Sequence, residues 1–153
     1  MKFILSPELG RLSKWLRILG FDVVYAVYDD IASVLIQALR DARIILTRNV
    51  RLINKLRVGK SIQIKSDKVN QQLRQVIKDL DIDLNTVDMF SRCTICNAGL
   101  KQIDKQQIQS RVPEYVLKMH NEFFTCPLCR RIYWAGTHWG NVQRCLEQIG
   151  YNA

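Results

Sequence analysis

The sequence lacks any long apolar segment and contains little glycine or proline, with 7 and 3 residues among 153. No run of about 20 apolar residues occurs, so no membrane-spanning helix is expected. The short apolar run before Ser6 is too brief for a signal peptide. Internal repeats and low-complexity segments are absent, and hydrophobic residues make up 48%. This composition excludes a disordered, collagen-like or membrane-embedded protein, and we expect a folded cytoplasmic protein without a membrane partner.

Acidic residues are scarce relative to basic ones. The chain has 14 Asp and Glu against 23 Lys and Arg, which gives a net charge of +9. Basic residues outnumber acidic ones both in residues 1–88 and in residues 89–153. Residues 40–60 alone carry seven basic residues and one acidic residue. A partner that contacts this surface should therefore be acidic.

Residues 2–80 alternate short apolar runs with helical periods, which is typical of β-α-β units around a parallel sheet. Apolar runs at residues 3–5, 22–25, 44–46 and 61–64 predict four strands. Leucines at 9, 12, 16 and 19 predict a first helix, with Ser6 as its N-cap and Gly20 at its end. Further helices are predicted after Asp30, after Asn49 and from Val69 to residue 80.

The character of the sequence changes near residue 88. We predict an α/β domain over residues 1–88 and a second domain over residues 89–153. In the second domain, residues 122–134 predict a hairpin and residues 137–149 a last helix. A separate piece of about 65 residues is marginal without a metal or another crosslink.

Four of the five cysteines form two C-x-x-C pairs separated by 29 residues. Two thiolates from each tight turn supply a closed tetrahedral site, which leaves no position for water or substrate. We therefore predict one structural Zn²⁺ in a zinc ribbon. The predicted ligands are Cys93, Cys96, Cys126 and Cys129.

Three stretches resemble the Mut-seven C-terminal ribonuclease domain family, in which a PIN-like nuclease domain is fused to a zinc ribbon. Residues 2–22 resemble that family's first strand and helix, and residues 44–49 resemble its Leu-Thr-Arg-Asp strand end. The cysteine pairs followed by residues 133–139 resemble its ribbon ending. The resemblance implies a PIN-like parallel sheet with flanking helices, followed by the four-cysteine zinc ribbon.

The resemblance also implies a nuclease site, in which carboxylates at the carboxyl ends of the strands hold Mg²⁺ or Mn²⁺. Asp29 or Asp30 fits the acid after the second strand, and Asp67 is a candidate after the fourth. Ser6 and Asn49, however, stand where the family pattern has aspartates. Because a divalent ion needs those charges, we predict a degenerate catalytic site.

Loss of carboxylates makes this edge better suited to phosphate than to metal. Basic residues on the first helix and in residues 40–60 then favour contacts with an RNA backbone. The predicted RNA-binding residues are Arg11, Lys14, Arg17, Arg48, Arg51, Lys55 and Arg57.

Our preferred interpretation is an RNA-binding protein with a degenerate nuclease site. It would act on or within a structured RNA particle such as the ribosome, with rRNA or a ribosomal subunit as its partner. The alternative is an active endoribonuclease that uses Asp29, Asp30, Asp67 and Glu8 with Mg²⁺ or Mn²⁺. A toxin-type or DNA-directed module is a third interpretation, because phosphate contacts do not distinguish DNA from RNA.

Overall fold

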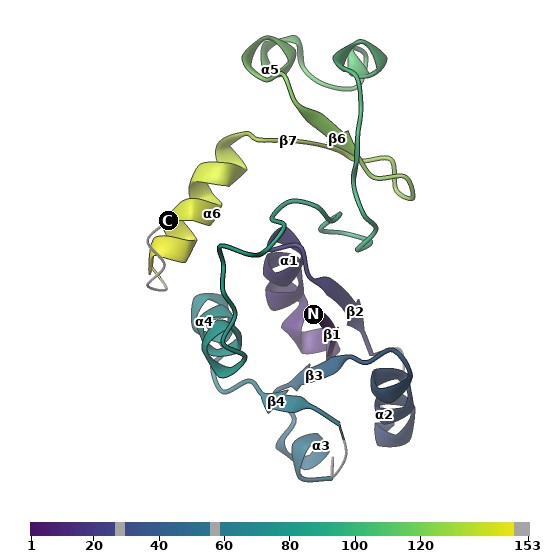
Figure 1. The fold of residues 1–153 in the computed structure, drawn as a ribbon, viewed down its shortest axis with the longest axis vertical. Helices are drawn as coiled ribbons and strands as arrows, with labels where there is room; N and C mark the ends of the chain where they lie inside the picture. The colour runs from purple at the N-terminus through teal and green to yellow at the C-terminus, as the bar shows by residue number, and fades with distance from the viewer. Residues whose placement is uncertain (27–29, 56–58, 149–153) are drawn as a thin grey trace.

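The α/β part of the molecule is built on a four-stranded parallel sheet (Figure 1). The computed structural model describes residues 1–26, 30–55 and 59–148. The strands are β1 (Lys2–Leu5), β2 (Asp22–Tyr25), β3 (Ile44–Thr47) and β4 (Ser61–Gln63). Their spatial order is β2-β1-β3-β4, so β2 lies at one edge and the ends of β1 and β3 are neighbours. The predicted parallel α/β architecture is confirmed.

Helices cover both faces of this sheet. They are α1 (Gly10–Ile18), α2 (Ile31–Arg40), α3 (Val50–Lys55) and α4 (Val69–Asp79). Successive side chains of a strand point to opposite faces. Phe3 and Leu5 accordingly belong to the large core shared with α1 and α4, whereas Ile4 packs with Val34 and Ala38 of α2.

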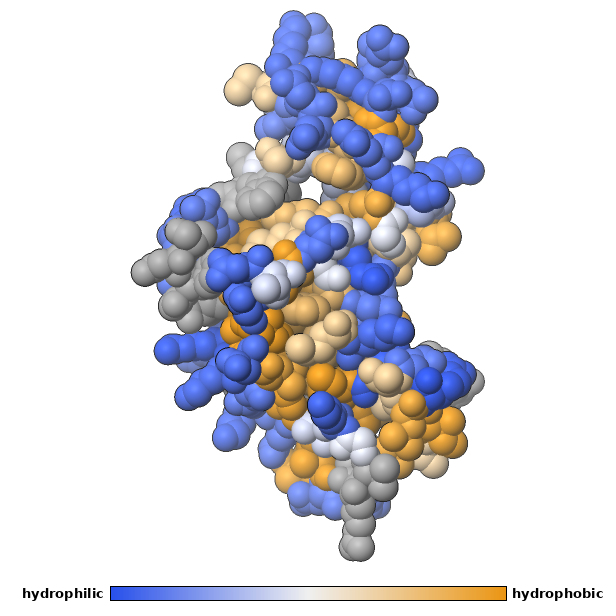
Figure 2. All heavy atoms as spheres, in the orientation of Figure 1, coloured by the Kyte–Doolittle hydropathy of each residue, from blue (hydrophilic) through white to orange (hydrophobic). Residues whose placement is uncertain are grey.

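The ribbon contains a three-stranded antiparallel sheet in the order β5-β6-β7. Its strands are β5 (Lys101–Gln102), β6 (Phe123–Thr125) and β7 (Ile132–Trp134). Phe123 is buried with Ile108, Val112 and Val116, the last of which lies on the short helix α5 (Glu114–Met119). Hydrophilic side chains cover most of this upper end of the molecule in Figure 2.

The last helix, α6 (Thr137–Gln148), leaves the ribbon and packs against the α/β part (Figure 1). Val142 and Leu146 of α6 belong to the same buried core as Phe3. The Asn70 side-chain amide of α4 also donates to Gln148 Oε1 at 3.3 Å. The two parts of the chain therefore share a core, and a division at residue 88 remains a prediction.

The predicted N-caps give different results. Asn49 caps α3, since its Oδ1 accepts from the backbone N–H groups of Arg51 at 3.0 Å and Leu52 at 3.2 Å. Ser6 precedes a 3-10 turn, Pro7–Leu9, but its side chain makes no capping hydrogen bond. Ser6 therefore occupies the predicted N-cap position of the turn that leads into α1, but its hydroxyl donates to Thr47 and does not cap the helix. None of the described helices is long and apolar enough to cross a membrane.

Candidate metal centre and nucleic-acid interface

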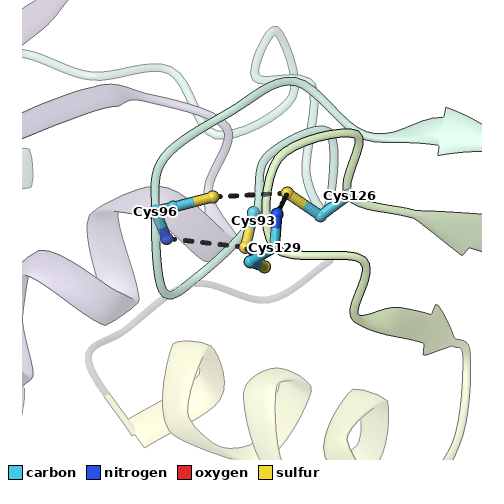
Figure 3. Close-up of side chains that lie close together, drawn as sticks. All are labelled: Cys93, Cys96, Cys126 and Cys129. Atoms are coloured by element: carbon cyan, nitrogen blue, oxygen red, sulfur yellow. Dashed lines mark hydrogen bonds between the residues drawn. The ribbon is translucent and has the colours of Figure 1, made fainter.

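Four cysteine thiols converge where the two C-x-x-C turns meet (Figure 3). All four sulfur atoms lie within 4.8 Å of one another, with Cys93 Sγ 3.5 Å from Cys129 Sγ and Cys96 Sγ 3.3 Å from Cys126 Sγ. Zn–S bonds of about 2.3 Å in a tetrahedron would place the sulfurs about 3.8 Å apart. The four cysteines are therefore positioned to bind one metal ion.

The two turns have the same local structure. The N–H of Asn97 donates to the Cys93 carbonyl at 3.0 Å, and the N–H of Arg130 donates to the Cys126 carbonyl at 2.9 Å. Asn97 and Arg130 both have left-handed backbones, with φ of 69° and 60°. This repeated turn directs both sulfurs of each pair to one side, as a metal knuckle requires.

The surroundings of Cys93 favour its thiolate form. Burial opposes ionisation, but hydrogen bonds from the Cys96 backbone N–H and the Tyr133 hydroxyl outweigh it and lower the pKa of Cys93 to about 6. The Tyr133 hydroxyl lies 3.0 Å from Cys93 Sγ. A hydrogen bond from the Ala98 backbone lowers the pKa of Cys96, but its contacts with Cys126 and the other thiols, together with burial, outweigh this and raise that pKa to about 12. The thiols therefore differ without metal, and they must lose their protons to ligate it.

A second polar group lies at the carboxyl ends of β1 and β3. The Ser6 hydroxyl donates to Thr47 Oγ1 at 2.7 Å, and Thr47 Oγ1 also accepts from the Asn49 backbone N–H at 3.0 Å. Thr47 is fully buried. Beside this group, Glu8 Oε1 accepts from the Arg48 backbone N–H at 3.3 Å. The neutral residues Ser6 and Asn49 are thus linked through Thr47 at the sheet edge where the sequence predicted a carboxylate site.

Among the described residues, Asp30, Asp67 and Glu8 do not form a group of three side chains able to hold a metal. Asp30 is exposed, and hydrogen bonds from Ser33 lower the pKa of this carboxyl while it caps α2. Asp67 is exposed between β4 and α4. Asp29 lies outside the described residues. In the part of the chain that the structure describes, the cysteines are the only group of three or more Cys, His, Asp or Glu side chains able to hold a metal.

Most of the predicted RNA-binding residues lie on the surface. Those that are exposed are Arg11, Lys14, Arg48, Arg51 and Lys55, and Arg57 lies outside the described residues. The prediction that Arg17 binds RNA is wrong, because only 5% of this residue is accessible to solvent. Its guanidinium donates to the carbonyls of Val23, Thr94 and Ile95, so it has no free face for phosphate.

The family model of the Mut7-C RNAse domain matches residues 1–146, which is nearly the whole chain and includes both sites. This chain belongs to the Mut7-C RNAse domain family. Comparisons with curated proteins and with solved structures found no match. The Mut7-C membership connects the chain with RNA-related, nuclease-like proteins.

Sequence reasoning missed three residues of this Mut7-C chain. Thr47 lies within the strand-end motif and links Ser6 to Asn49. Arg17 was grouped with the exposed cations of α1, but it lies one helical turn after Ser13 on the buried side of that helix. Asn97 follows the first cysteine pair, and its side chain reaches β2. No local pattern encodes a contact between residues more than 70 positions apart.

Proposed function

We propose that this protein binds RNA through the carboxyl edge of its parallel sheet and that its nuclease site is degenerate. The observation that carries the proposal is the hydrogen-bonded group of Ser6, Thr47 and Asn49. It occupies the two strand ends at which the family pattern has aspartates. A neutral hydroxyl and amide there provide no charge for a divalent cation.

The hydrogen bonds of this group also support a non-catalytic role. Asn49 Oδ1 already accepts two backbone N–H groups of α3, and the Ser6 hydroxyl is directed to Thr47. Both side chains are therefore committed to local structure. If only about 4 kcal/mol of metal-based transition-state stabilisation is lost, the rate of hydrolysis falls by roughly 10³.

The charges around this edge suit a phosphate backbone. Arg48 directly precedes Asn49 and Arg51 follows it by two residues, and Lys55 extends the exposed basic surface along α3. Arg11 and Lys14 add two exposed cations on α1. A structured RNA particle such as the ribosome, with rRNA as the ligand, offers the dense phosphate that such a surface fits. We also propose that the protein acts in the cytoplasm.

We also propose that the ion at the four cysteines is Zn²⁺. A closed set of four thiolates selects zinc among common ions and leaves no open coordination position. The ion would hold the two turns together and take no part in hydrolysis. Elemental analysis of protein purified without chelator should find one zinc per chain, and its absence would contradict this assignment.

A salt titration of RNA affinity tests the RNA surface. The six predicted cations other than Arg17 would contact about six phosphates, which gives a log–log salt slope of about −4 to −5. Replacing Arg48, Arg51 and Lys55 together by Ala should flatten the slope by about 2–3 units. The control is a triple Ala variant at three other exposed cations, Lys65, Arg74 and Lys78. Equal slopes for the two variants would place the RNA elsewhere, for example on the ribbon.

An active Mg²⁺- or Mn²⁺-dependent endoribonuclease is the second candidate. Glu8 favours it, because this carboxylate lies at the same edge beside the backbone of Arg48. Asp30, Asp67 and the undescribed Asp29 would supply the other ligands. Metal-dependent cleavage of generic RNA that Asp30→Asn abolishes would support this candidate over the first.

A further inference from the structure

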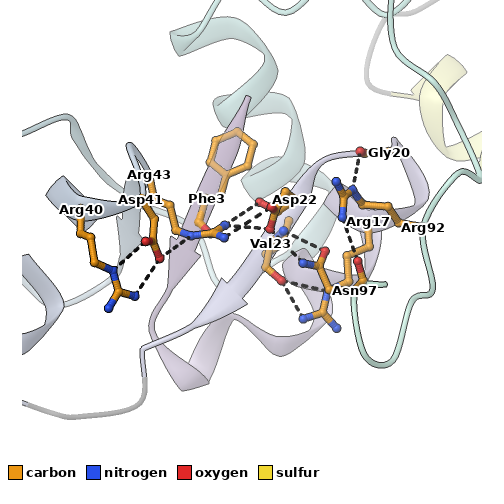
Figure 4. A network of polar contacts seen from close by, with 10 residues as sticks. All are labelled: Phe3, Arg17, Gly20, Asp22, Val23, Arg40, Asp41, Arg43, Arg92 and Asn97. Atoms are coloured by element: carbon orange, nitrogen blue, oxygen red, sulfur yellow. Dashed lines mark hydrogen bonds and ion pairs between the residues drawn. The ribbon is translucent and has the colours of Figure 1, made fainter. Parts of the chain in front are cut away.

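The first cysteine turn docks on the free edge of the parallel sheet (Figure 4). Strand β2 is an edge strand, and the outward N–H of Val23 donates to Asn97 Oδ1 at 2.9 Å. The side-chain amide of Asn97 in turn donates to Asp22 Oδ1 at 2.9 Å. The Asn97 side chain therefore satisfies one outward backbone N–H of the edge strand and also holds the Asp22 carboxylate.

Arg17 completes this junction from inside the α/β part. Its Nε and Nη2 donate to the Val23 carbonyl at 3.2 Å and 2.8 Å. Its Nη1 donates to the carbonyls of Thr94 at 3.1 Å and Ile95 at 2.7 Å. A buried guanidinium is costly unless its donors are satisfied. Two of the three carbonyls that satisfy it belong to the cysteine turn.

These contacts depend on the conformation that ligates the metal. Thr94 and Ile95 are the two residues between the ligands Cys93 and Cys96, and Asn97 follows directly. The left-handed φ of 69° at Asn97 directs its side chain toward β2 while its N–H closes the turn onto the Cys93 carbonyl. A turn that opens without metal no longer presents its carbonyls and amide to the sheet.

The second cysteine turn provides a natural contrast. Arg130 occupies the position equivalent to Asn97 and has a similar φ of 60°. Arg130 is exposed, and its carbonyl accepts a hydrogen bond from Arg111 within the ribbon. The two turns thus have the same backbone conformation, but only the first is hydrogen-bonded to β2 through the side chain at this position.

We propose that metal binding at the four cysteines stabilises the parallel sheet itself, through the contacts of Asn97 and Arg17 with β2. Asn97 and Arg17 are positioning residues that transmit the state of the metal site to the edge strand. The folding of the RNA-binding sheet then depends on metal supply. The inference rests on the proposed zinc site and extends it beyond the ribbon.

Hydrogen exchange of the 153-residue chain tests this coupling. For the β1 amides, the exchange rate after removal of the metal by a chelator is divided by the rate before removal. Strand β1 is chosen because the Asn97 side chain bonds to β2, so a change at β1 reports on the sheet. We expect a ratio far above one in the natural protein. Asn97→Gly keeps a left-handed turn but removes the side-chain amide, and it should lower the ratio roughly 25-fold, about fivefold for each of two lost hydrogen bonds. Arg130→Gly should leave the ratio unchanged.

Two further measurements keep the outcome decisive. Zinc content is determined for each variant. Arg17→Met serves as a second test if Asn97→Gly fails to bind zinc, because it removes the Arg17 hydrogen bonds of the junction without replacing a residue of the cysteine turn. If Arg17 only stabilised the fold, Arg17→Met would raise the exchange rates by the same factor with and without metal, and their ratio would equal that of the natural protein. A ratio near one in zinc-loaded natural protein, or equal ratios in Asn97→Gly and Arg130→Gly, overturns the inference. Protein that binds no zinc refutes the metal site itself.

Discussion

Restoring two carboxylates at the sheet edge should convert this protein into a metal-binding nuclease. The change is Ser6→Asp combined with Asn49→Asp. Asp at position 49 retains the oxygen that caps α3, and Asp at position 6 can accept from the Thr47 hydroxyl that now accepts from Ser6. The fold should therefore tolerate the exchange, because Asp caps a helix as well as Asn does.

The magnitude follows from the charges at that edge. Two new carboxylates beside Glu8 form a group of three, which is enough to bind a divalent ion through carboxylates and water. Without metal, two like charges about 4 Å apart repel by roughly 4 kcal/mol at an effective dielectric constant near 20. A bound cation reverses this repulsion. A gain of about 4 kcal/mol in transition-state stabilisation corresponds to a rate increase of roughly 10³.

Calorimetry with Mn²⁺ and a cleavage assay on generic RNA measure both effects. The matched control is Ser6→Asn with the natural Asn49, which has side chains of the same size without the charges. We expect tighter Mn²⁺ binding and faster cleavage only in the Asp variant. If the double Asp variant binds Mn²⁺ no more tightly than the control, the assignment of positions 6 and 49 to the metal site is refuted.

Three further predictions concern stability. Cys126→Ser should remove the metal and unfold residues 89–153, detected as loss of bound zinc and of the ribbon's amide protection; a folded, zinc-loaded variant would contradict this. Gly20→Ala should destabilise the protein by about 2–4 kcal/mol in thermal or urea unfolding, because φ is +89° and a Cβ would lie 2.2 Å from the Asp88 carbonyl oxygen. Burial opposes ionisation of Asp22, but hydrogen bonds from Arg43 and Asn97 lower its pKa below 3.8. Asp22 therefore contributes stability above pH of about 4 that is lost as pH falls through the lowered pKa, and Asp22→Asn should flatten the acid limb of a stability–pH curve.

The sequence predicted the elements of the fold because their signals are local. The strands of the parallel sheet have apolar runs whose alternate side chains, such as Phe3 and Ile4, fill opposite faces. The paired cysteine spacing likewise predicted the metal centre. Helix α5 was missed because six residues make fewer than two helical turns and give a weak periodic signal, and its stability comes from the packing of Val116 on the ribbon.

The candidate site was less predictable because it depends on contacts between distant residues. Basic side chains on a helix give no indication of which one is buried, so Arg17 was grouped with Arg11 and Lys14. Its role follows only when residues 94–95 are brought beside α1 by the ribbon. Ser6 was expected to cap a helix, but the neighbouring β3 offers Thr47 as a closer partner.

RNA binding and RNA cleavage measured together on the natural protein test the central claim most directly. One preparation, with its zinc content known, is titrated with labelled RNA and then incubated with Mg²⁺ or Mn²⁺. We predict salt-dependent binding with cleavage at least about 10³-fold slower than that of the variant with Asp at positions 6 and 49. Rapid metal-dependent cleavage by the natural protein, abolished by Asp30→Asn, would contradict the degenerate site and establish an active ribonuclease.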